Sequence, residues 1–396
     1  MAGASLRERD RRWSLLDQAM SNAGHDLLIF VGNDYRGHKG TLRYVADFNL
    51  EHRNGTVVKP RGGDAILVLP GNLSTQRHTS DWVTDIRFPK KLVSGLVDIL
   101  RTQSWVRSVG IVGQNQIMRV EDYSVLTESL PRIAFSDATH LFEQVRVVKS
   151  AEELVGVEES AYILDRCFDR LLEVAAPGRT EREIAAEMYR TATLLGGEDT
   201  LFLTMYADVA AATGRAGVTW GVPRDRVLRS SDLFVFSFEV TGPRGYWTEF
   251  SRMVTFQRPS DELAHMAAAV TDGIAVSSAA LGEGIDDPVL VQERVLESAK
   301  RFGVTSGYWS GHSIGLDVLE APMIGAEVVD NDLSQSADEK PVLCGPGSVI
   351  TLHPMLWDPH HDVMGYMADT FVVENNGCRV LSTHPTKLYQ VAGGSS

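Results

Sequence analysis

The sequence predicts an α+β protein of two domains, in which a smaller α/β domain precedes a larger domain of long helices and antiparallel strands. The chain has 396 residues, which is enough for two domains of ordinary size. Helical and strand patterns alternate up to about residue 145, as is typical of an α/β unit. After residue 150 two long helical patterns come first, and strand patterns separated by short turns follow them.

The first domain opens with an amphipathic helical pattern over residues 11–26, in which Leu16 and Met20 recur at helical spacing. The apolar run over 27–31 predicts a buried strand that ends at a glycine and an asparagine. The other elements expected in this domain are a strand over 65–70, a helix over 91–102 and a strand over 109–113. We place the boundary after residue 148, so that the domains span 1–148 and 149–396.

The second domain begins with two helix-start signals. Ser150 can cap a helix that runs to about Ala175, and the acidic residues that follow it favour the positive end of the helix dipole. Thr180 and Glu183 form a second capping box, which opens a helix through residue 195. The elements expected after these helices are strands over 233–240 and 245–256 joined by a hairpin loop, helices over 260–281 and 288–302, and strands over 349–354 and 370–374.

Composition and charge exclude several classes of protein. With 43% hydrophobic and 23% charged residues, the chain is neither fibrous nor disordered. The formal net charge of −14 would repel a phosphate backbone, so we do not expect nucleic acid as a partner. The three cysteines lie far apart and form no disulfide framework or zinc motif, which fits a reducing cytoplasm. We expect no signal peptide, no membrane span and a cytoplasmic location.

Several segments, taken in order, resemble the pita-bread superfamily of methionine aminopeptidase, aminopeptidase P, prolidase and creatinase, which includes metallopeptidase family M24. The segments are PGRTERE, GYWTEFSR, GHSIGLDVLEAP, GPGSVITLHP and MADTFVVENNG. The resemblance implies a C-terminal pita-bread domain, preceded by the smaller α/β domain of the creatinase and prolidase branch. It also implies a homodimer.

Metallopeptidase members of this superfamily hold two metal ions with two aspartates, a histidine and two glutamates. The resemblance maps these five positions onto Ser237, Glu249, His312, His353 and Ala368. Two divalent ions a few ångströms apart need several carboxylates to balance their charge, and most of those carboxylates are missing here. We therefore do not expect a dinuclear site or an ordinary dinuclear peptidase.

Two alternatives remain for the three ionisable positions. Glu249, His312 and His353 together offer two imidazoles and one carboxylate, a set that suits a single Fe, Mn or Zn ion. The same groups would also serve as a metal-free acid–base cluster, as in creatinase. Creatinase activity itself is disfavoured, because Trp220 in the TWGVP segment stands where that enzyme has its catalytic histidine.

Glu239 is a further candidate for the catalytic site. It lies two residues after Ser237, and positions two apart in a strand point to the same face, so Glu239 would be able to replace the missing acid. The acidic spacing also resembles that of the pita-bread dimethylsulfoniopropionate lyase. The alternative is a surface charge at the end of a hairpin.

Four residues are candidates for substrate binding. Trp220 and Trp309 neighbour mapped site positions and would line a drier pocket than a peptidase has, although aromatic residues also fill cores. Glu320 would be either a base at the pocket edge or one half of a salt bridge at the rim. His361 would be either part of a proton shuttle or a solvated loop residue. We expect Arg252 to hold neighbouring strands together through an ion pair.

These observations favour an enzyme that acts on a small molecule and cleaves a C–N or other carbon–heteroatom bond, as a hydrolase or a lyase. His312 and His353 would supply acid–base groups or metal ligands, with Glu249 as their charge partner. Two alternatives remain open: a catalytically inactive pita-bread domain used as a binding module, and a residual Xaa-Pro aminopeptidase or dipeptidase.

Overall fold

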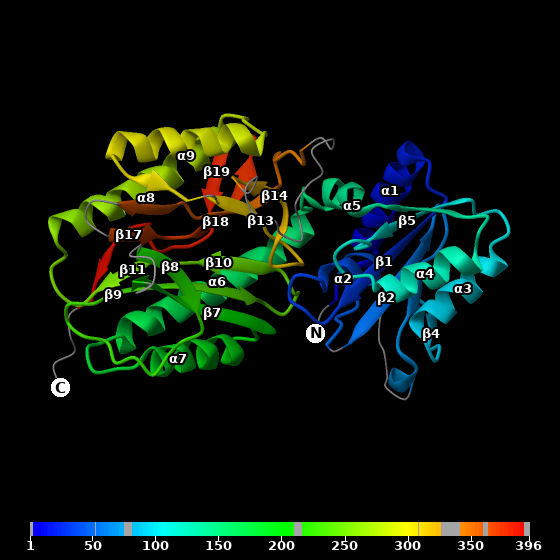
Figure 1. Ribbon diagram of the computed structural model, residues 1–396, viewed down its shortest axis with the longest axis horizontal. Coiled ribbons are helices and arrows are strands. Elements are labelled where there is room, and N and C mark those ends of the chain that lie inside the picture. The colour runs from blue at the N-terminus through cyan, green and yellow to red at the C-terminus, as the bar shows by residue number, and fades with distance from the viewer. Residues whose placement is uncertain are drawn as a thin grey trace. The chain divides into compact units, whose positions relative to one another are not determined.

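The computed structural model describes residues 3–51, 53–74, 81–209, 216–307, 309–325, 341–358 and 363–391 (Figure 1). The chain divides into two compact units. The N-terminal unit comprises Met1–Arg146 with Leu316–Val318, and the C-terminal unit comprises Val147–Gly315 with Leu319–Ser396.

A mixed six-stranded sheet forms the centre of the N-terminal unit. Its strands run in the order β4-β3-β2-β1-β5-β6, with β1 parallel to β5 and antiparallel to β2. The elements of this unit are α1 Leu6–Ala23, β1 Leu27–Asn33, α2 Gly40–Ala46, β2 Asn54–Pro60, β3 Ile66–Val68, η1 Gly71–Leu73, β4 Asp85–Arg87, α3 Leu92–Thr102, β5 Ser108–Val112, α4 Val120–Ser129, β6 Ala134–Asp137 and α5 Thr139–Arg146. The elements expected over 11–26, 27–31, 65–70, 91–102 and 109–113 are all present, which confirms the predicted alternation.

The described residues of the C-terminal unit form three sheets. Their strand orders are β20-β11-β9-β7-β8 with β10 paired to β9, β12-β16-β17, and β14-β13-β15-β18-β19. The elements are α6 Ala151–Val174, α7 Glu181–Leu194, β7 Asp199–Val209, β8 Ala216–Gly221, β9 Leu233–Thr241, β10 Trp247–Phe250, β11 Met253–Thr255, α8 Asp261–Gly282, α9 Pro288–Phe302, β12 Thr305–Ser306, β13 Gly311–Ser313, β14 Glu320–Ile324, β15 Val349–Leu352, β16 Met355–Asp358, β17 Val363–Tyr366, β18 Asp369–Glu374, β19 Gly377–Val380 and β20 Tyr389–Gln390.

Both predicted helix starts of this unit are capping boxes in the structure. The Ser150 side chain accepts from the Glu153 backbone N–H and Glu153 bonds back to the Ser150 N–H, and Thr180 and Glu183 do the same for α7. The strand expected over 245–256 is divided into β10 and β11, because Ser251 between them pairs with Ala368 instead of continuing along β9. The long strand β7 and its neighbour β8 were not predicted.

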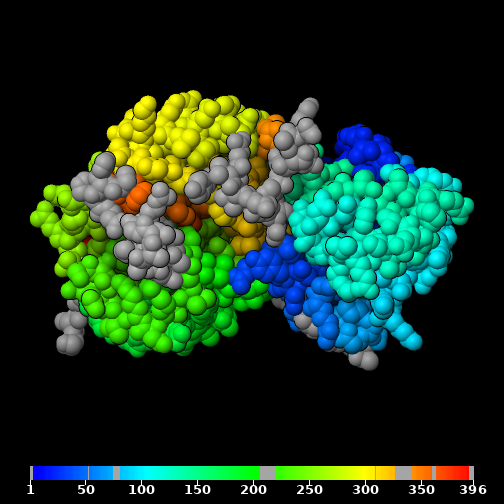
Figure 2. All heavy atoms as spheres, viewed as in Figure 1, coloured from blue at the N-terminus to red at the C-terminus, as the bar shows by residue number. Residues whose placement is uncertain are grey.

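The helices cover the sheets from two sides. In Figure 2 the yellow atoms of α9 and the green atoms of the α7 region lie on opposite sides of the C-terminal unit, with orange atoms between them. Phe236, Phe238 and Phe250 pack with α6 and α7 in one apolar cluster, while α8 and α9 pack with β15–β18 in another. Strand β10 thus packs against the layer of α6 and α7, and strand β15 packs against the layer of α8 and α9.

Helix α8 is long and apolar enough, by length and composition alone, to cross a membrane. Its mean hydropathy is 1.2, and 44% of its most apolar stretch is buried inside the unit. Met266, Val270 and Ile274 on this helix belong to the apolar cluster described above. This is the pattern of a core helix of a folded domain.

Candidate functional site

Strand β10 places Glu249 in the interior of the C-terminal unit. The residues before and after it, Thr248 and Phe250, point to the opposite face, where Phe250 joins the apolar cluster of α6 and α7. The Glu249 backbone N–H donates to Thr370 Oγ1 at 3.0 Å, and the same hydroxyl donates to the Glu249 carbonyl at 3.0 Å. Thr370 thus holds the backbone of Glu249 against β18, and the side chain is only 3% exposed.

The two carboxylate oxygens of Glu249 have different partners. Oε1 accepts hydrogen bonds from the hydroxyls of Ser237 at 2.8 Å and Tyr366 at 2.7 Å. Oε2 faces Nε2 of His312 at 3.3 Å. Burial by itself would raise the pKa of Glu249, but His353, His312 and the Tyr366 hydroxyl lower it to about 2. Glu249 is therefore a carboxylate at neutral pH, with one oxygen directed at the histidines.

His312, on β13, has a ring orientation set by the backbone carbonyl of the next residue. Nδ1 lies 2.8 Å from the Ser313 carbonyl oxygen, which can only accept, so Nδ1 carries the proton. Nε2 then faces the ionised Glu249 carboxylate. A lone pair on Nε2 would repel that carboxylate, so a cation, either a second ring proton or a metal ion, is required between them.

His353 follows β15 directly and is almost entirely buried, with 4% exposure. Its backbone N–H donates to the Ser310 carbonyl at 2.8 Å, which fixes the position of the residue. Its Nδ1 is buried and has no hydrogen-bond partner among the residues that the structure describes. Burial lowers the pKa of His353 to about 4, so the ring is neutral near pH 7 and keeps a lone pair.

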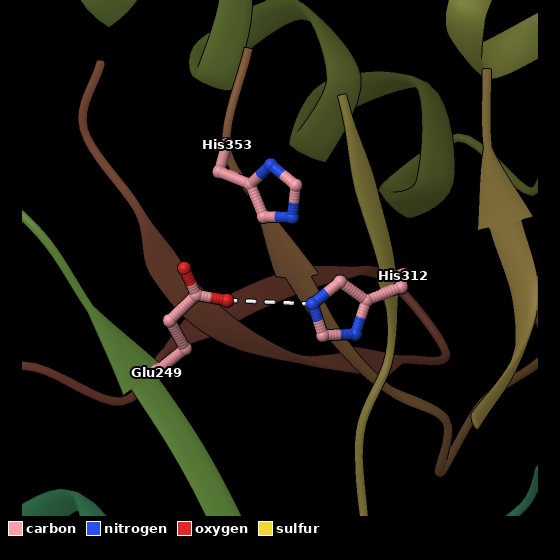
Figure 3. Close-up of side chains that lie close together, drawn as sticks. All are labelled: Glu249, His312 and His353. Atoms are coloured by element: carbon pink, nitrogen blue, oxygen red, sulfur yellow. Dashed lines mark ion pairs between the residues drawn. The ribbon is translucent and has the colours of Figure 1, made fainter. Parts of the chain in front are cut away.

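These three side chains converge from three strands, as Figure 3 shows. One ligand-type atom from each of Glu249, His312 and His353 lies within 4.8 Å of the other two. Two imidazoles and a carboxylate form a donor set that suits Zn, Fe or Mn. His312 Nε2 and the Glu249 carboxylate, two acceptors that face each other, fit a bound cation between them, and the His353 ring nitrogen directed towards them is Nε2 (Figure 3).

The other two mapped positions offer no carboxylate to this site. Ser237 acts as a hydroxyl donor to Glu249, and Ala368 has no ligand atom in its side chain. The Ala368 backbone instead pairs with Ser251 through both of its hydrogen-bonding groups. The Oε1 side of Glu249 is already occupied by two hydroxyl protons.

Glu239 lies on the same face of the sheet as Ser237. It is half-buried and stands directly opposite Glu249 in the β9–β10 pair. Directly opposed residues in such a pair have Cβ atoms about 4.5–5.5 Å apart. This placement favours the site role over the hairpin-end surface charge, although Glu239 is outside the three-residue group.

Other candidates have mixed outcomes. Trp220 on β8 is half-buried and meets the Tyr366 ring edge-on at 4.8 Å, and Trp309 lies 5.3 Å from the His353 ring between centroids. Arg252 is fully buried and pairs with Asp369, as expected for a residue that ties strands together. His361 lies outside the described residues.

Glu320 takes a position different from both of its expected roles. Its carboxylate lies 2.8 Å from Lys149 Nζ, and both side chains are 2% exposed, so the pair is buried and is not at a rim. Lys149 Nζ also lies 3.3 Å from Ser313 Oγ, next to His312. We therefore assign Glu320 a supporting role and no longer propose it as a base.

Tyr366 and Thr370 were missed by the sequence analysis. Both flank Ala368 in the GYMADT segment, and a hydroxyl on either side of a lost ligand position is the signal that was available. Neither residue type is a strong metal ligand. The pattern therefore indicates that these hydroxyls form hydrogen bonds with a metal-binding side chain and do not coordinate the metal themselves.

Tyr366→Phe is expected to weaken metal binding about 10- to 100-fold, because outer partners of a ligating carboxylate have effects of this size. Among the described residues, the variant leaves Oε1 of Glu249 with the Ser237 hydroxyl as its remaining donor. A competition titration with a chelating dye measures the change. Tyr162→Phe, at an exposed tyrosine of α6, is the matched control. A dissociation constant within twofold of wild type for Tyr366→Phe would contradict the assignment.

The lowered pKa of His353 predicts a dependence of stability on pH. The ordinary pKa is 6.5 and the folded value about 4, so the unfolded chain binds the extra proton between these values. Above pH 6.5 the ring is neutral in both states and has no effect on stability, whereas the folded state loses stability as the pH falls from 6.5 towards 4. Between pH 7 and 5 the free energy of unfolding should fall by about 2 kcal/mol from this group. Urea unfolding of wild type and His353→Gln, both freed of metal with a chelator, measures this change, and the same fall in unfolding free energy between pH 7 and pH 5 in both proteins would refute the prediction.

Comparisons with known proteins agree with this architecture. Metallopeptidase family M24 matches residues 156–380, and the Creatinase/Prolidase N-terminal domain matches residues 12–148. The uncharacterized peptidase YqhT of Bacillus subtilis is 28% identical over 250 residues, which cover 62% of this chain and 65% of that protein. The probable dipeptidase PepE of Mycobacterium bovis is 25% identical over 260 residues, covering 64% of this chain and 63% of that protein.

Solved structures show the same fold. Dipeptidase PepE from Mycobacterium ulcerans superposes with a TM-score of 0.77 at 21% identity, covering 99% of this chain and 100% of that one. The Xaa-Pro dipeptidase from Bacillus anthracis gives a TM-score of 0.75 at 19% identity, covering 96% and 99%. The chain therefore belongs to metallopeptidase family M24, with the pita-bread fold and a creatinase-type N-terminal domain.

Proposed function

We propose that this protein is a hydrolase that cleaves a C–N bond in a small molecule, with one divalent ion held by Glu249, His312 and His353. The observation that carries the proposal is the convergence of their three ligand-type atoms within 4.8 Å. The relatives with a functional name are peptidases or dipeptidases, which supports hydrolysis over elimination. The names of these relatives do not define the substrate of this chain. Its site keeps three ionisable side chains, whereas the metallopeptidase centre has five ligands.

The hydroxyl donors on Glu249 support one ion in preference to two. A carboxylate that bridges two ions uses both oxygens, whereas Oε1 here receives hydrogen bonds from Ser237 and Tyr366. With Ser237 and Ala368 in place of acids, the group lacks the negative charge that a second divalent ion requires.

A bound ion would supply Lewis-acid polarisation of the scissile group and a water of lowered pKa. The protein would contribute the remaining functions. Tyr366 and Ser237 orient Glu249, and the Ser313 carbonyl orients His312. Glu239, opposite Glu249 on the same face, is the carboxylate that we assign to accept the proton of the attacking water.

Metal analysis of protein purified without added metal or chelator tests the proposal. About one equivalent of Zn, Fe or Mn is expected in wild type and a near-complete loss in His353→Gln. His265→Gln, at an exposed histidine of α8, is the matched control and should keep its metal. Two equivalents in wild type would support a dinuclear peptidase. Metal-free but active protein would support the acid–base cluster, with a protonated His312 beside Glu249.

The dipeptidase function is a second candidate because relatives are named for it. Assays with Xaa-Pro dipeptides in the presence of Mn(II) or Co(II) distinguish the two, and we expect no cleavage. A protein with neither metal nor turnover on either substrate class would be a binding module.

The homodimer implied by the resemblance also stays a prediction, which sedimentation velocity tests.

A further inference from the structure

Aromatic rings flank the Glu249 cluster on two sides. Trp220 packs edge-on against Tyr366, whose hydroxyl bonds to Glu249. Trp309 lies with its ring centroid 5.5 Å from that of His312 and 5.3 Å from that of His353. Both tryptophans are half-buried, so neither is fully enclosed by the residues that the structure describes. Exposed indole surface of this kind binds apolar groups and organic cations.

The charges that face the cluster are negative. Glu249 is ionised, and Glu239 stands opposite it on the same face of the sheet. The charge of Glu239 is among the causes that raise the pKa of Tyr366, after burial and Glu249, so it acts within the same group of side chains. Two carboxylates balance the charge of one divalent ion, which leaves the site without excess positive charge for an anionic substrate.

The basic side chains near the site are already engaged. Within the described part of the C-terminal unit, the buried cations Lys149 and Arg252 pair with Glu320 and Asp369. Arg224 and Arg226, which follow Trp220 in the chain, both donate to the buried Glu181. Among the residues described, the site therefore has no uncommitted arginine or lysine for the carboxylate of a dipeptide.

We propose that the substrate carries a compact organic cation, such as a quaternary ammonium or protonated amine, held against Trp220 and Trp309. This inference rests on the proposed function and names its substrate class. The indole faces attract the cation through their quadrupoles, and the two carboxylates offset the charge of the divalent ion, so that the site carries no excess positive charge to repel the cation. A carboxylate at the same place would meet aromatic faces and like charges.

A series of three probes of one shape tests the proposal. Choline, 3,3-dimethylbutan-1-ol and 3,3-dimethylbutanoate share a branched apolar head, with a positive charge, no charge and a negative charge respectively. Isothermal titration calorimetry on the protein as purified should show choline binding at least about tenfold more tightly than the neutral alcohol. The carboxylate should bind most weakly. Equal affinities, tighter binding of the carboxylate or no binding of choline would each overturn the proposal.

Variants locate the binding. Trp220→Leu should reduce the preference for choline to within about threefold, whereas Trp220→Phe keeps an aromatic face and should retain most of it. Trp105→Leu, at an exposed tryptophan of the N-terminal unit, is the matched control and should behave as wild type. If Trp220→Leu fails to fold, Trp309→Leu serves the same purpose. An unchanged preference in folded Trp220→Leu or Trp309→Leu would place the cation elsewhere and overturn the assignment.

Metal content measured on the same samples separates this inference from the proposed function. Protein with one equivalent of metal and no preference for choline would leave the single-ion hydrolase standing and reject the cationic substrate. A clear preference for choline in metal-free protein would support the cation site and reject the single-ion function.

Discussion

Arg252→Met is expected to lower the free energy of unfolding of the C-terminal unit by about 3–5 kcal/mol, the cost of leaving a buried charge without its partner. Arg252 and Asp369 are both fully buried, with a guanidinium-to-carboxylate distance of 2.9 Å. The guanidinium also donates to the carbonyls of Ala368 and His384, at 2.9 and 2.6 Å. Its loss therefore removes an ion pair and several hydrogen bonds beside the strand that carries Thr370.

Differential scanning calorimetry measures this change. Arg252→Met combined with Asp369→Leu should recover part of the loss, because the double variant leaves no buried charge unpaired. Arg301→Met, which breaks the exposed pair with Asp272, is the control and should cost no more than about 1 kcal/mol. Similar losses for the buried and the exposed pair would contradict the interpretation of Arg252 as the residue that ties these strands.

Glu249→Gln is expected to weaken metal binding by more than about 100-fold and to abolish turnover. The effect should exceed that of an outer partner such as Tyr366, because Glu249 is the single carboxylate of the three-residue group. The substitution keeps the size of the side chain and removes its charge. Metal analysis after dialysis, with a chelator competition series, measures the affinity.

Two further variants define what this result means. Glu249→Asp keeps the charge but shortens the side chain by one methylene. Partial metal binding in this variant would show that the charge contributes to affinity even when the carboxylate is displaced from its native position. Glu297→Gln, at an exposed glutamate of α9, is the control. Retention of metal at wild-type affinity in Glu249→Gln would show that the ion, if bound, has a different set of ligands.

Elements with strong local signals were predictable from the sequence. The capping residues Ser150 and Thr180 begin α6 and α7 as expected, because their hydrogen bonds involve residues only three positions away. Strands β7 and β8 lack such local signals. They form by pairing with each other and with β9, and such long-range pairing is not visible in a short window of sequence.

The same distinction holds at the site. Glu249, His312 and His353 were identified by residue type and order, and the structure brings them together from β10, β13 and the end of β15. The partner of Glu320 was not predictable, because Lys149 is 171 positions away in the chain. The hydroxyl of Tyr366 was also missed, since its partner Glu249 is 117 positions away.

By itself, then, the sequence determined the order of helices, the two-domain α+β organisation and the residue types available for chemistry. These follow from the spacing of apolar residues, from local caps and from composition. Only the tertiary structure decided which oxygen of Glu249 faces His312, which donors occupy the other oxygen, and which cations are already paired. These features depend on contacts between distant strands, and burial there sets both the charges and the pKa values of the groups involved.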